Sequence, residues 1–169
     1  MEKNLVLLGM MTVGKTTIGK IVAKNLGLSF VDTDKYIEEK NSMTVKEIFE
    51  KKGEKFFRHQ EKKEIREILK TNECVISLGG GAFIDKSLRK SILKNCISVW
   101  LDLDIKTLSN RTKWNQKRPL LKKNNNFEKI KYIYAKRRNI YKMANHRVLC
   151  DNLTKKKIAS KIESIYEKY

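Results

Sequence analysis

The residues with the clearest chemical purpose form a glycine-bounded loop close to the start of the sequence. Gly9, Gly14, Lys15 and Thr16 fill every fixed position of the phosphate-binding pattern G-x-x-x-x-G-K-[ST]. Between a buried strand and a helix, such a loop turns its backbone N–H groups inward, where a polyphosphate also meets the positive end of the helix dipole. The expected binding residues are Thr12, Val13, Gly14, Lys15, Thr16 and Thr17.

Two side chains of this loop would add a charge and a metal ligand. The Lys15 ammonium would reach the β- and γ-phosphates, and the Thr16 hydroxyl would ligate Mg²⁺. A side chain at Gly14 would obstruct that approach. The context favours this interpretation over a chance glycine-rich turn, because Leu5–Leu8 is typical of a buried strand and apolar residues recur at helical spacing over 18–26.

Two aspartates follow the second expected strand, residues 28–31. Carboxylates at the carboxyl end of a strand lie where open α/β sheets bind their ligands. Asp32 and Asp34 are two residues apart and can point the same way, so one can hold Mg²⁺ through water while the other takes a substrate hydroxyl. The alternative is that Asp32 and Thr33 only cap the next helix. Asp102, at the end of another apolar run, is a rival Mg²⁺ ligand that we rank below Asp32.

An arginine beside two aromatic residues is a candidate carboxylate clamp. A capping box at 44–47 opens a short helix, and Gly53 separates it from a longer helix that carries Phe57, Arg58 and Glu61. The planar guanidinium of Arg58 can bind a carboxylate with two hydrogen bonds. The alternative is a surface ion pair with Glu61, three residues away.

Three consecutive glycines, Gly79, Gly80 and Gly81, follow a third buried strand at 74–78. Such a run costs conformational entropy, so a compact fold keeps it where the backbone must approach something closely. We expect that neighbour to be a second substrate. A flexible turn is the alternative.

Hydrophobic periodicity disappears between residues 112 and 126, where the sequence is polar and positively charged around Arg118 and Pro119. This composition predicts a mobile lid that closes over ATP and excludes water. Arg118 would then be the cation that stabilises the transition state. An ordinary exposed loop is the alternative.

The rest of the chain supplies the other expected elements of an α/β fold. Strands are predicted at 98–101 and 148–150, and helices at 86–94, around Leu108 and Arg111, at 128–143 and at 154–169. In the helix at 128–143, Arg137 falls close to the apolar stripe. Arg138 lies about 100° further round and should be more exposed.

Length and composition favour a single cytoplasmic domain over residues 1–169. The sequence opens directly on a strand rather than on a targeting signal, and it has no apolar run long enough to span a bilayer, so we expect no membrane contact. Cys74, Cys96 and Cys150 are widely spaced within apolar runs and are expected to be buried thiols. The two histidines stand alone and suggest no metal site.

The net charge of +19 is concentrated in the last part of the chain. Residues 105–169 contain 19 Lys and Arg against 4 Asp and Glu. A surface of this sign can bind nucleic acid. However, the basic residues are not interleaved with aromatic platforms, so we interpret most of them as solvated helix faces and expect no nucleic-acid partner.

Five features, taken in order, together resemble shikimate kinase over nearly the whole chain. They are Gly9–Thr17, Asp32–Asp34, Phe57-Arg58 with Glu61, Gly79–Gly81 and Arg118–Leu121. The resemblance implies a three-layer P-loop kinase fold of the nucleoside monophosphate kinase type. Such a fold has a five-stranded parallel sheet in the order 2-3-1-4-5, flanked by helices, with a lid at about 112–126 and a substrate-binding helical region at about 33–61.

The resemblance also implies an activity: shikimate and ATP give shikimate 3-phosphate and ADP, on the chorismate route to aromatic amino acids, in a monomer. It places Lys15 and the loop amides on phosphate, Thr16 and Asp32 on Mg²⁺, and Arg118 in the lid. Catalysis is thus assigned to Lys15, Asp34 and Arg118, with Asp34 as the candidate base that also binds the substrate hydroxyls. Shikimate is bound by Arg58, the 79–81 glycines and Arg137, and Arg111 packs against adenine.

Two positions depart from the family pattern. Thr12 stands where the family usually has glycine, so its backbone must avoid a positive φ or accept strain, with a small loss of ATP affinity. Near Arg137 the family spaces arginine, tyrosine and alanine as R-x-x-x-Y-x-x-x-A, but here Ala144 comes one residue early, which leaves Arg138 as an alternative clamp. The rival functions are a gluconate or nucleoside monophosphate kinase of the same fold, and a nucleic-acid-binding protein that uses ATP as a switch.

Overall fold

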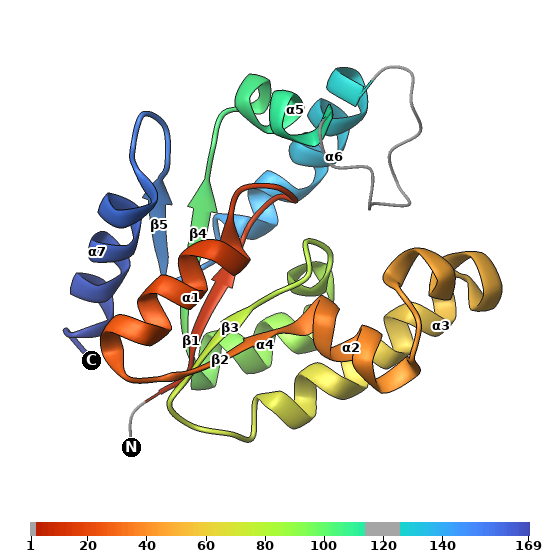
Figure 1. Ribbon diagram of the computed structural model, residues 1–169, viewed down its shortest axis with the longest axis horizontal. Helices are drawn as coiled ribbons and strands as arrows, with labels where there is room; N and C mark the ends of the chain where they lie inside the picture. The colour runs from red at the N-terminus through yellow and green to blue at the C-terminus, as the bar shows by residue number, and fades with distance from the viewer. Residues whose placement is uncertain (1–2, 114–125) are drawn as a thin grey trace.

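A parallel β-sheet organises the protein, which a computed structural model describes over residues 3–113 and 126–169 (Figure 1). Its five strands have the order β2-β3-β1-β4-β5, as the family resemblance implied. The strands are β1 (Leu5–Leu8), β2 (Ser29–Asp32), β3 (Cys74–Ser77), β4 (Ile97–Asp102) and β5 (His146–Leu149). All adjacent pairs are parallel, with Val6 opposite Ile76 on one side and Ser98 on the other.

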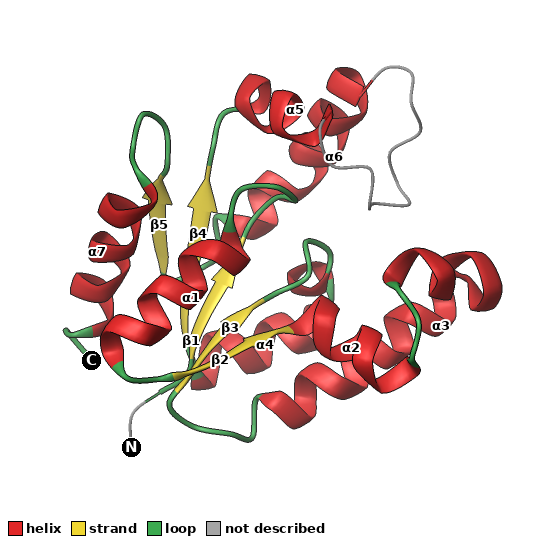
Figure 2. Ribbon diagram, in the orientation of Figure 1, coloured by secondary structure: helices red, strands yellow, loops and turns green. Residues whose placement is uncertain are grey.

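Helices cover the sheet and complete the α/β fold (Figure 2). They are α1 (Lys15–Leu26), α2 (Thr33–Asn41), α3 (Val45–Ile68), the 3-10 helix η1 (Ala82–Ile84), α4 (Lys86–Asn95), α5 (Ile105–Lys113), α6 (Asn126–Tyr141) and α7 (Lys155–Tyr166). Because helices lie on both faces, every residue of β1, β3 and β4 is buried. This explains the continuous apolar runs from which these strands were predicted.

The local start signals that the sequence contains are used as expected. Asp85 accepts hydrogen bonds from the Ser87 and Leu88 amides at the start of α4, and Thr44 forms the predicted capping box with Glu47 at the start of α3. Gly53, with φ 82° and ψ 166°, interrupts α3 where the sequence predicted a break between two helices.

Helices α2 and α3 project from the sheet as an arm with a small core of its own (Figure 1). The small core consists of three buried apolar residues, Ile37, Ile48 and Phe57. The surrounding apolar side chains are only partly buried. The main core, in contrast, gathers around the sheet, and the arm reaches the rest of the protein near η1 and α4.

Several element boundaries differ from the sequence predictions. The last strand is His146–Leu149 rather than 148–150, and the helix expected at 128–143 is Asn126–Tyr141. The most important difference concerns Asp34, which lies in the first turn of α2 and not at the end of a strand. The alternating geometry of a strand therefore does not bring Asp32 and Asp34 together.

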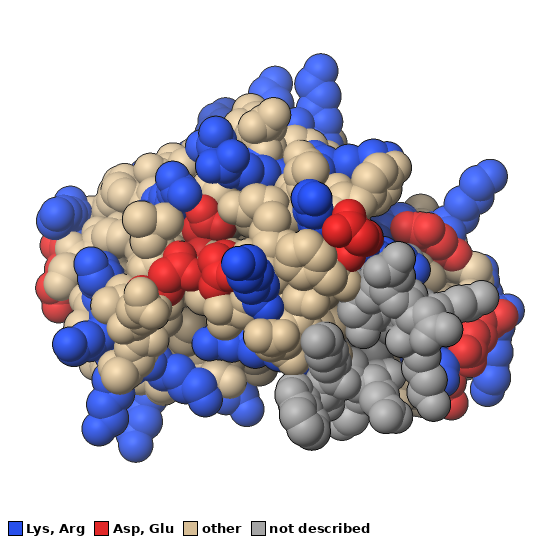
Figure 3. All heavy atoms as spheres, turned by 90° about the horizontal axis from the view of Figure 1, so that it is seen from above, with Lys and Arg blue, Asp and Glu red and all other residues tan. Residues whose placement is uncertain are grey.

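The remaining composition-based expectations concern thiols, membranes and charge. Cys74, Cys96 and Cys150 are buried and free, as expected. Within residues 3–113 and 126–169, no helix is long and apolar enough to cross a bilayer. Lys and Arg project around the face seen in Figure 3, with Asp and Glu in small groups between them.

Candidate active site

The loop between β1 and α1 has the backbone conformation that a phosphate-binding loop requires. Gly9 and Gly14 adopt φ values of 140° and 106°, in the region that favours glycine. A Cβ on Gly9 would also stand 2.5 Å from the Leu101 carbonyl oxygen, so the first glycine is required for space as well. Thr12 has φ 63°. The sequence left open whether Thr12 avoids a positive φ or has a strained backbone, and the structure shows the strained backbone.

Lys15 is 93% buried and folds back over this loop. Its ammonium donates hydrogen bonds to the carbonyl oxygens of Gly9, at 3.0 Å, and Met10, at 2.9 Å. These contacts hold the charge at the start of α1, within reach of the cavity that the loop encloses. An anion bound there would therefore meet a cation that is already in place.

Thr16 and Asp32, the two expected metal ligands, are in direct contact. The Thr16 hydroxyl donates to Asp32 Oδ2 at 2.5 Å. The other carboxylate oxygen, Oδ1, accepts from the amides of Asp34 and Lys35 and caps α2. The helix cap that the sequence offered for Asp32 is therefore confirmed, and the other carboxylate oxygen contacts Thr16 of the loop.

The rival aspartate lies in a different environment. Asp102, at the end of β4, is 4% exposed and pairs with Arg147 at 2.6 Å. It also accepts a hydrogen bond from Tyr134 at 2.9 Å. This carboxylate is therefore engaged between β4, β5 and α6, and it is not among the residues that line the cavity beside the loop.

A cavity of about 310 Å³ joins the loop to the ends of β2 and β3. It contains both aspartates of the 32–34 segment, and Arg111 borders it from α5 with Nη1 3.4 Å from the Val13 carbonyl oxygen. The lining residues are Thr12, Gly14, Lys15, Thr16, Thr17, Asp32, Asp34, Ser77, Leu78 and Arg111. Eight of these were selected from the sequence; Ser77 and Leu78 were not, because apolar runs do not indicate which residue reaches a cavity.

The glycine turn after β3 allows charged side chains to approach the backbone. A Cβ on Gly79 would stand 2.4 Å from Asp34 Oδ1, and one on Gly81 would stand 2.7 Å from Arg58 Nη1. At Gly80 the nearest atom would be Arg137 Nη1, at 3.3 Å. Within the protein, the close neighbours of the three glycines are thus candidate site residues.

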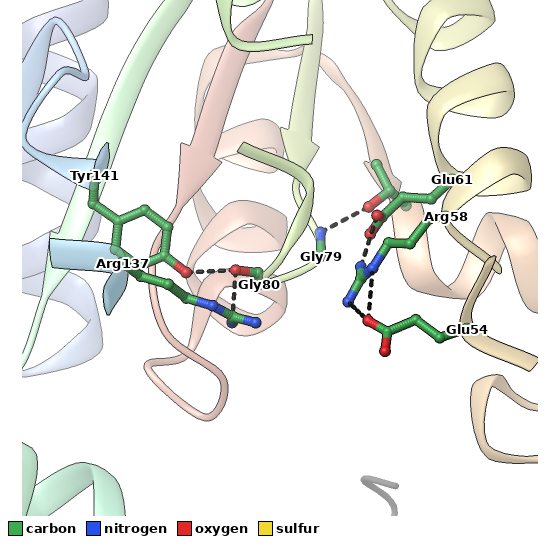
Figure 4. Close-up of polar contacts among 8 residues, drawn as sticks. Glu54, Arg58, Glu61, Gly79, Gly80, Arg137 and Tyr141 are labelled. Carbon is green, nitrogen blue, oxygen red and sulfur yellow. Dashed lines mark hydrogen bonds and ion pairs between the residues drawn. The ribbon is translucent and has the colours of Figure 1, made fainter. Parts of the chain in front are cut away.

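Arg58 reaches the turn from α3 and is held by two glutamates (Figure 4). Its guanidinium donates to Glu61 at 2.8 Å and to Glu54 at 3.3 Å. Burial disfavours the charge of Arg58, but these carboxylates outweigh burial and raise its pKa above the usual value. The sequence interpretation as an ion pair is therefore correct, although Glu61 is only 3% exposed and the pair is not a surface contact.

Glu61 is a site residue whose position the sequence did not reveal. Burial raises the pKa of its carboxyl, Arg58 opposes that shift, and Asp34 adds to it. A Cβ on Gly79 would also stand 3.0 Å from Glu61 Oε1. The i, i+3 spacing to Arg58 indicated a partner, but only the packing of α3 beside the glycine turn buries that partner.

Arg137 reaches the other side of the turn from α6 (Figure 4). Its Nη1 donates to the Gly80 carbonyl oxygen at 2.9 Å, and the buried Tyr141 hydroxyl donates to the same oxygen. Arg138 is exposed. The helical-face argument therefore placed the two arginines correctly. Arg118, the expected lid cation, lies outside the described residues.

These features define a class of protein. A phosphate loop between β1 and α1 of a sheet ordered 2-3-1-4-5, beside a cation-bordered cavity, is the architecture of a P-loop kinase. The family model for shikimate kinase matches residues 11–167. The chain belongs to the shikimate kinase family.

Individual members of the family align with this chain over almost its full length. A shikimate kinase of Sulfurihydrogenibium sp. (strain YO3AOP1) is 44% identical over 160 residues, covering 95% of both proteins. One of Bacillus pumilus (strain SAFR-032) is 40% identical over 163 residues, covering 95% of this chain and 88% of the relative. A solved shikimate kinase from Acinetobacter baumannii, in complex with shikimate, matches with a TM-score of 0.94 at 31% identity, covering 98% of this chain and 93% of that one.

Proposed function

We propose that this protein transfers the γ-phosphoryl group of ATP to the 3-hydroxyl of shikimate, giving shikimate 3-phosphate and ADP for aromatic amino acid synthesis. The observation that carries this proposal is the pair of arginines, Arg58 and Arg137, that flank the glycine turn beside Asp34. An acceptor with one carboxylate and several hydroxyls fits this set, because guanidinium groups bind carboxylates and an aspartate accepts from hydroxyls. The A. baumannii relative was solved with such an acceptor, shikimate.

The nucleotide end of the site suits a polyphosphate with its metal. Hard cations such as Mg²⁺ prefer oxygen ligands, and the Thr16 hydroxyl and Asp32 Oδ2 lie together at the start of α1. We assign these two groups to Mg²⁺, which would neutralise charge on the phosphates. Lys15 and the backbone amides of residues 12–17 then bind the phosphate oxygens, and Arg111 borders the nucleoside.

Asp34 is the group assigned to the acceptor hydroxyl. It lines the same cavity as Lys15, so an alcohol bound to it lies next to the phosphate site. Phosphoryl transfer requires little covalent chemistry from the protein, and most of the acceleration comes from positioning and charge. Asp34 therefore orients the hydroxyl and receives its proton, while Lys15 and Arg118 stabilise the charge that develops on the transferred group.

Glu61 holds the acceptor clamp in place. It binds Arg58 from the side of α3 and leaves the guanidinium beside Gly81. Burial raises the pKa of the Glu61 carboxyl, and the charge of Arg58 opposes that shift, so the two side chains are coupled. We further propose a cytoplasmic monomer of one domain with no nucleic-acid partner, since small-molecule transfer accounts for the site.

The acceptor is tested by measuring ADP release with MgATP and a panel of shikimate, gluconate, nucleoside monophosphates and single-stranded RNA. We expect stimulation by shikimate alone. Stimulation by gluconate or a nucleotide would assign a different acceptor to the same fold, and stimulation by RNA alone would favour an ATP-driven switch. Asp34→Asn serves as the matched variant: it should lose turnover with shikimate while it still binds ADP, and preserved turnover would remove Asp34 from the reaction.

A further inference from the structure

Thr12 is an outlier in the backbone of the phosphate loop. Of the non-glycine residues with positive φ in the described ranges, which are Thr12, Ser42, Glu73 and Asn152, only Thr12 is β-branched and only Thr12 lines the cavity. A β-branched side chain in this region is strained, by about 1–3 kcal/mol. Strain of this kind persists only where neighbouring groups hold it, so the contacts of Thr12 indicate its purpose.

Those contacts join the loop to the last turn of α5. The Thr12 hydroxyl lies 3.3 Å from the Thr112 hydroxyl and 3.5 Å from the Leu108 carbonyl oxygen. It also lies 2.6 Å from the Met11 carbonyl oxygen within the loop. Thr112 is 3% exposed and lies 2.6 Å from the same Leu108 oxygen. The two hydroxyls therefore form a partly buried bridge between segments that are 100 residues apart in the sequence.

Each hydroxyl has one proton, so the bridge contains two protons for its contacts. If Thr112 donates to Leu108, Thr12 can donate to Thr112; if Thr12 donates to Met11, Thr112 can donate to Thr12. In these two arrangements a hydrogen bond joins the loop and the helix. If both hydroxyls donate to their own backbone carbonyls, Met11 and Leu108, at 2.6 Å each, no proton is left between them. Removal of the Thr112 hydroxyl leaves Thr12 only the longer contact with Leu108 across this interface.

Arg111 precedes Thr112 and is the cation that α5 contributes to the cavity. Its own contact with the loop, 3.4 Å to the Val13 carbonyl oxygen, is long for a hydrogen bond. The contact between the two hydroxyls, at 3.3 Å, is a second polar connection of similar length between this turn and the loop. A guanidinium packs well on the face of a flat ring, so the position of Arg111 affects a nucleoside more than it affects the phosphates next to Lys15.

We propose that Thr12 and Thr112 are positioning residues that fix the end of α5, with Arg111, against the phosphate loop and thereby set the affinity for the nucleoside part of ATP. This inference rests on the proposed nucleotide site. Binding of ADP in the absence of an acceptor separates the two: a parent protein that does not bind ADP contradicts the proposed function, whereas unchanged binding by the variants contradicts only the bridge.

The test is calorimetric titration of ADP and of inorganic tripolyphosphate, both with Mg²⁺, against the parent and Thr112→Val. This variant keeps the shape of the side chain and removes the hydroxyl. The Kd for ADP should rise about threefold to tenfold, as expected for one hydrogen bond between neutral groups, and the Kd for tripolyphosphate should stay within about twofold. Thr71→Val is the matched control, since Thr71 makes a similar bond to Ile68 at the end of α3, away from the cavity.

A Thr12 variant completes the design. Thr12→Ala should weaken the binding of ADP as Thr112→Val does. Because Thr12→Ala and Thr112→Val remove the same contact, the variant that combines them should bind ADP no more weakly than Thr12→Ala alone. Three results would each overturn the proposal. They are additive losses of ADP affinity in the double variant, an equal rise of the Kd for ADP and for tripolyphosphate, and an unchanged Kd for ADP in Thr112→Val.

Discussion

The substitution Gly79→Ala, which adds one methyl group, should lower activity while it leaves the free energy of unfolding nearly unchanged. In Gly79→Ala, the new Cβ would stand 2.4 Å from Asp34 Oδ1, about 1 Å short of an ordinary contact, which begins at 3.4 Å. The backbone φ of Gly79 lies outside the positive region, so alanine fits the local conformation. The end of the Asp34 side chain must move most, and Glu61 Oε1, which would lie 3.0 Å from the new Cβ, must give by a few tenths of an ångström.

The expected loss follows from the size of that movement. A displacement of about 1 Å at a reacting group costs about 10²-fold in rate, because positioning supplies much of the acceleration. Stability should change by less than about 1 kcal/mol, since the side chain can rotate away and alanine reduces the entropy of the unfolded chain. Gly79→Ala should therefore lower kcat/KM for shikimate about 10²-fold, with nearly the parental free energy of unfolding.

The assay is initial-rate ADP release at varied shikimate, combined with urea unfolding. Gly27→Ala is the control, because it should change stability and not activity. Gly27 caps the end of α1 with φ 69°, and a Cβ added there would have no atom within 4 Å. That variant should lose about 1 kcal/mol of stability from backbone strain and keep its kcat/KM. If Gly79→Ala retained kcat/KM within about threefold, the assignment of Asp34 to the acceptor would be refuted.

Three further predictions concern charged residues. Arg137→Ala should raise the KM for shikimate about tenfold or more, as for a lost charged hydrogen bond, whereas Arg138→Ala, on the exposed face, should leave it near the parental value; equal effects would contradict the assignment. Arg118→Ala should lower kcat about 10²-fold in the same assay with little change in shikimate binding, and an unchanged kcat would exclude Arg118 from the transition state. Burial of Asp85 is outweighed by the Leu88 amide and Lys62, which lower its pKa from 3.8 to about 2, so its contribution to stability is present above pH 3.8 and is lost as the pH falls through about 2. Because this carboxylate is 36% exposed, Asp85→Asn should lower the free energy of unfolding in urea by only about 1 kcal/mol at about pH 6. The difference in stability between parent and variant should shrink between about pH 4 and pH 2. A difference that stayed constant over this range would contradict the lowered pKa of Asp85.

The fold and the phosphate loop could be predicted because their signals are local. Apolar runs mark the buried strands, and the fixed residues from Gly9 to Thr16 are adjacent in the chain. The choice of Arg137 over Arg138 was likewise local, since one turn of helix decides which of the two neighbours faces Gly80.

The acceptor side could be predicted only as a set of candidates. Arg58, Gly81 and Arg137 meet through the packing of α3, η1 and α6, and no local pattern specifies those distances. Asp34 was selected on strand geometry, but the cap at Asp32 starts a helix and turns the chain there. Glu61 was missed as a site residue because its burial depends on the same packing.

The central claim is that the phosphoryl group passes to an alcohol held beside the phosphate loop. Phosphorus NMR of the protein with Mg²⁺, ATP and shikimate measures this directly. The account predicts a new phosphate monoester signal that grows in step with ADP and is absent with Asp34→Asn. Persistent ATP, or release of inorganic phosphate without the ester, would contradict it.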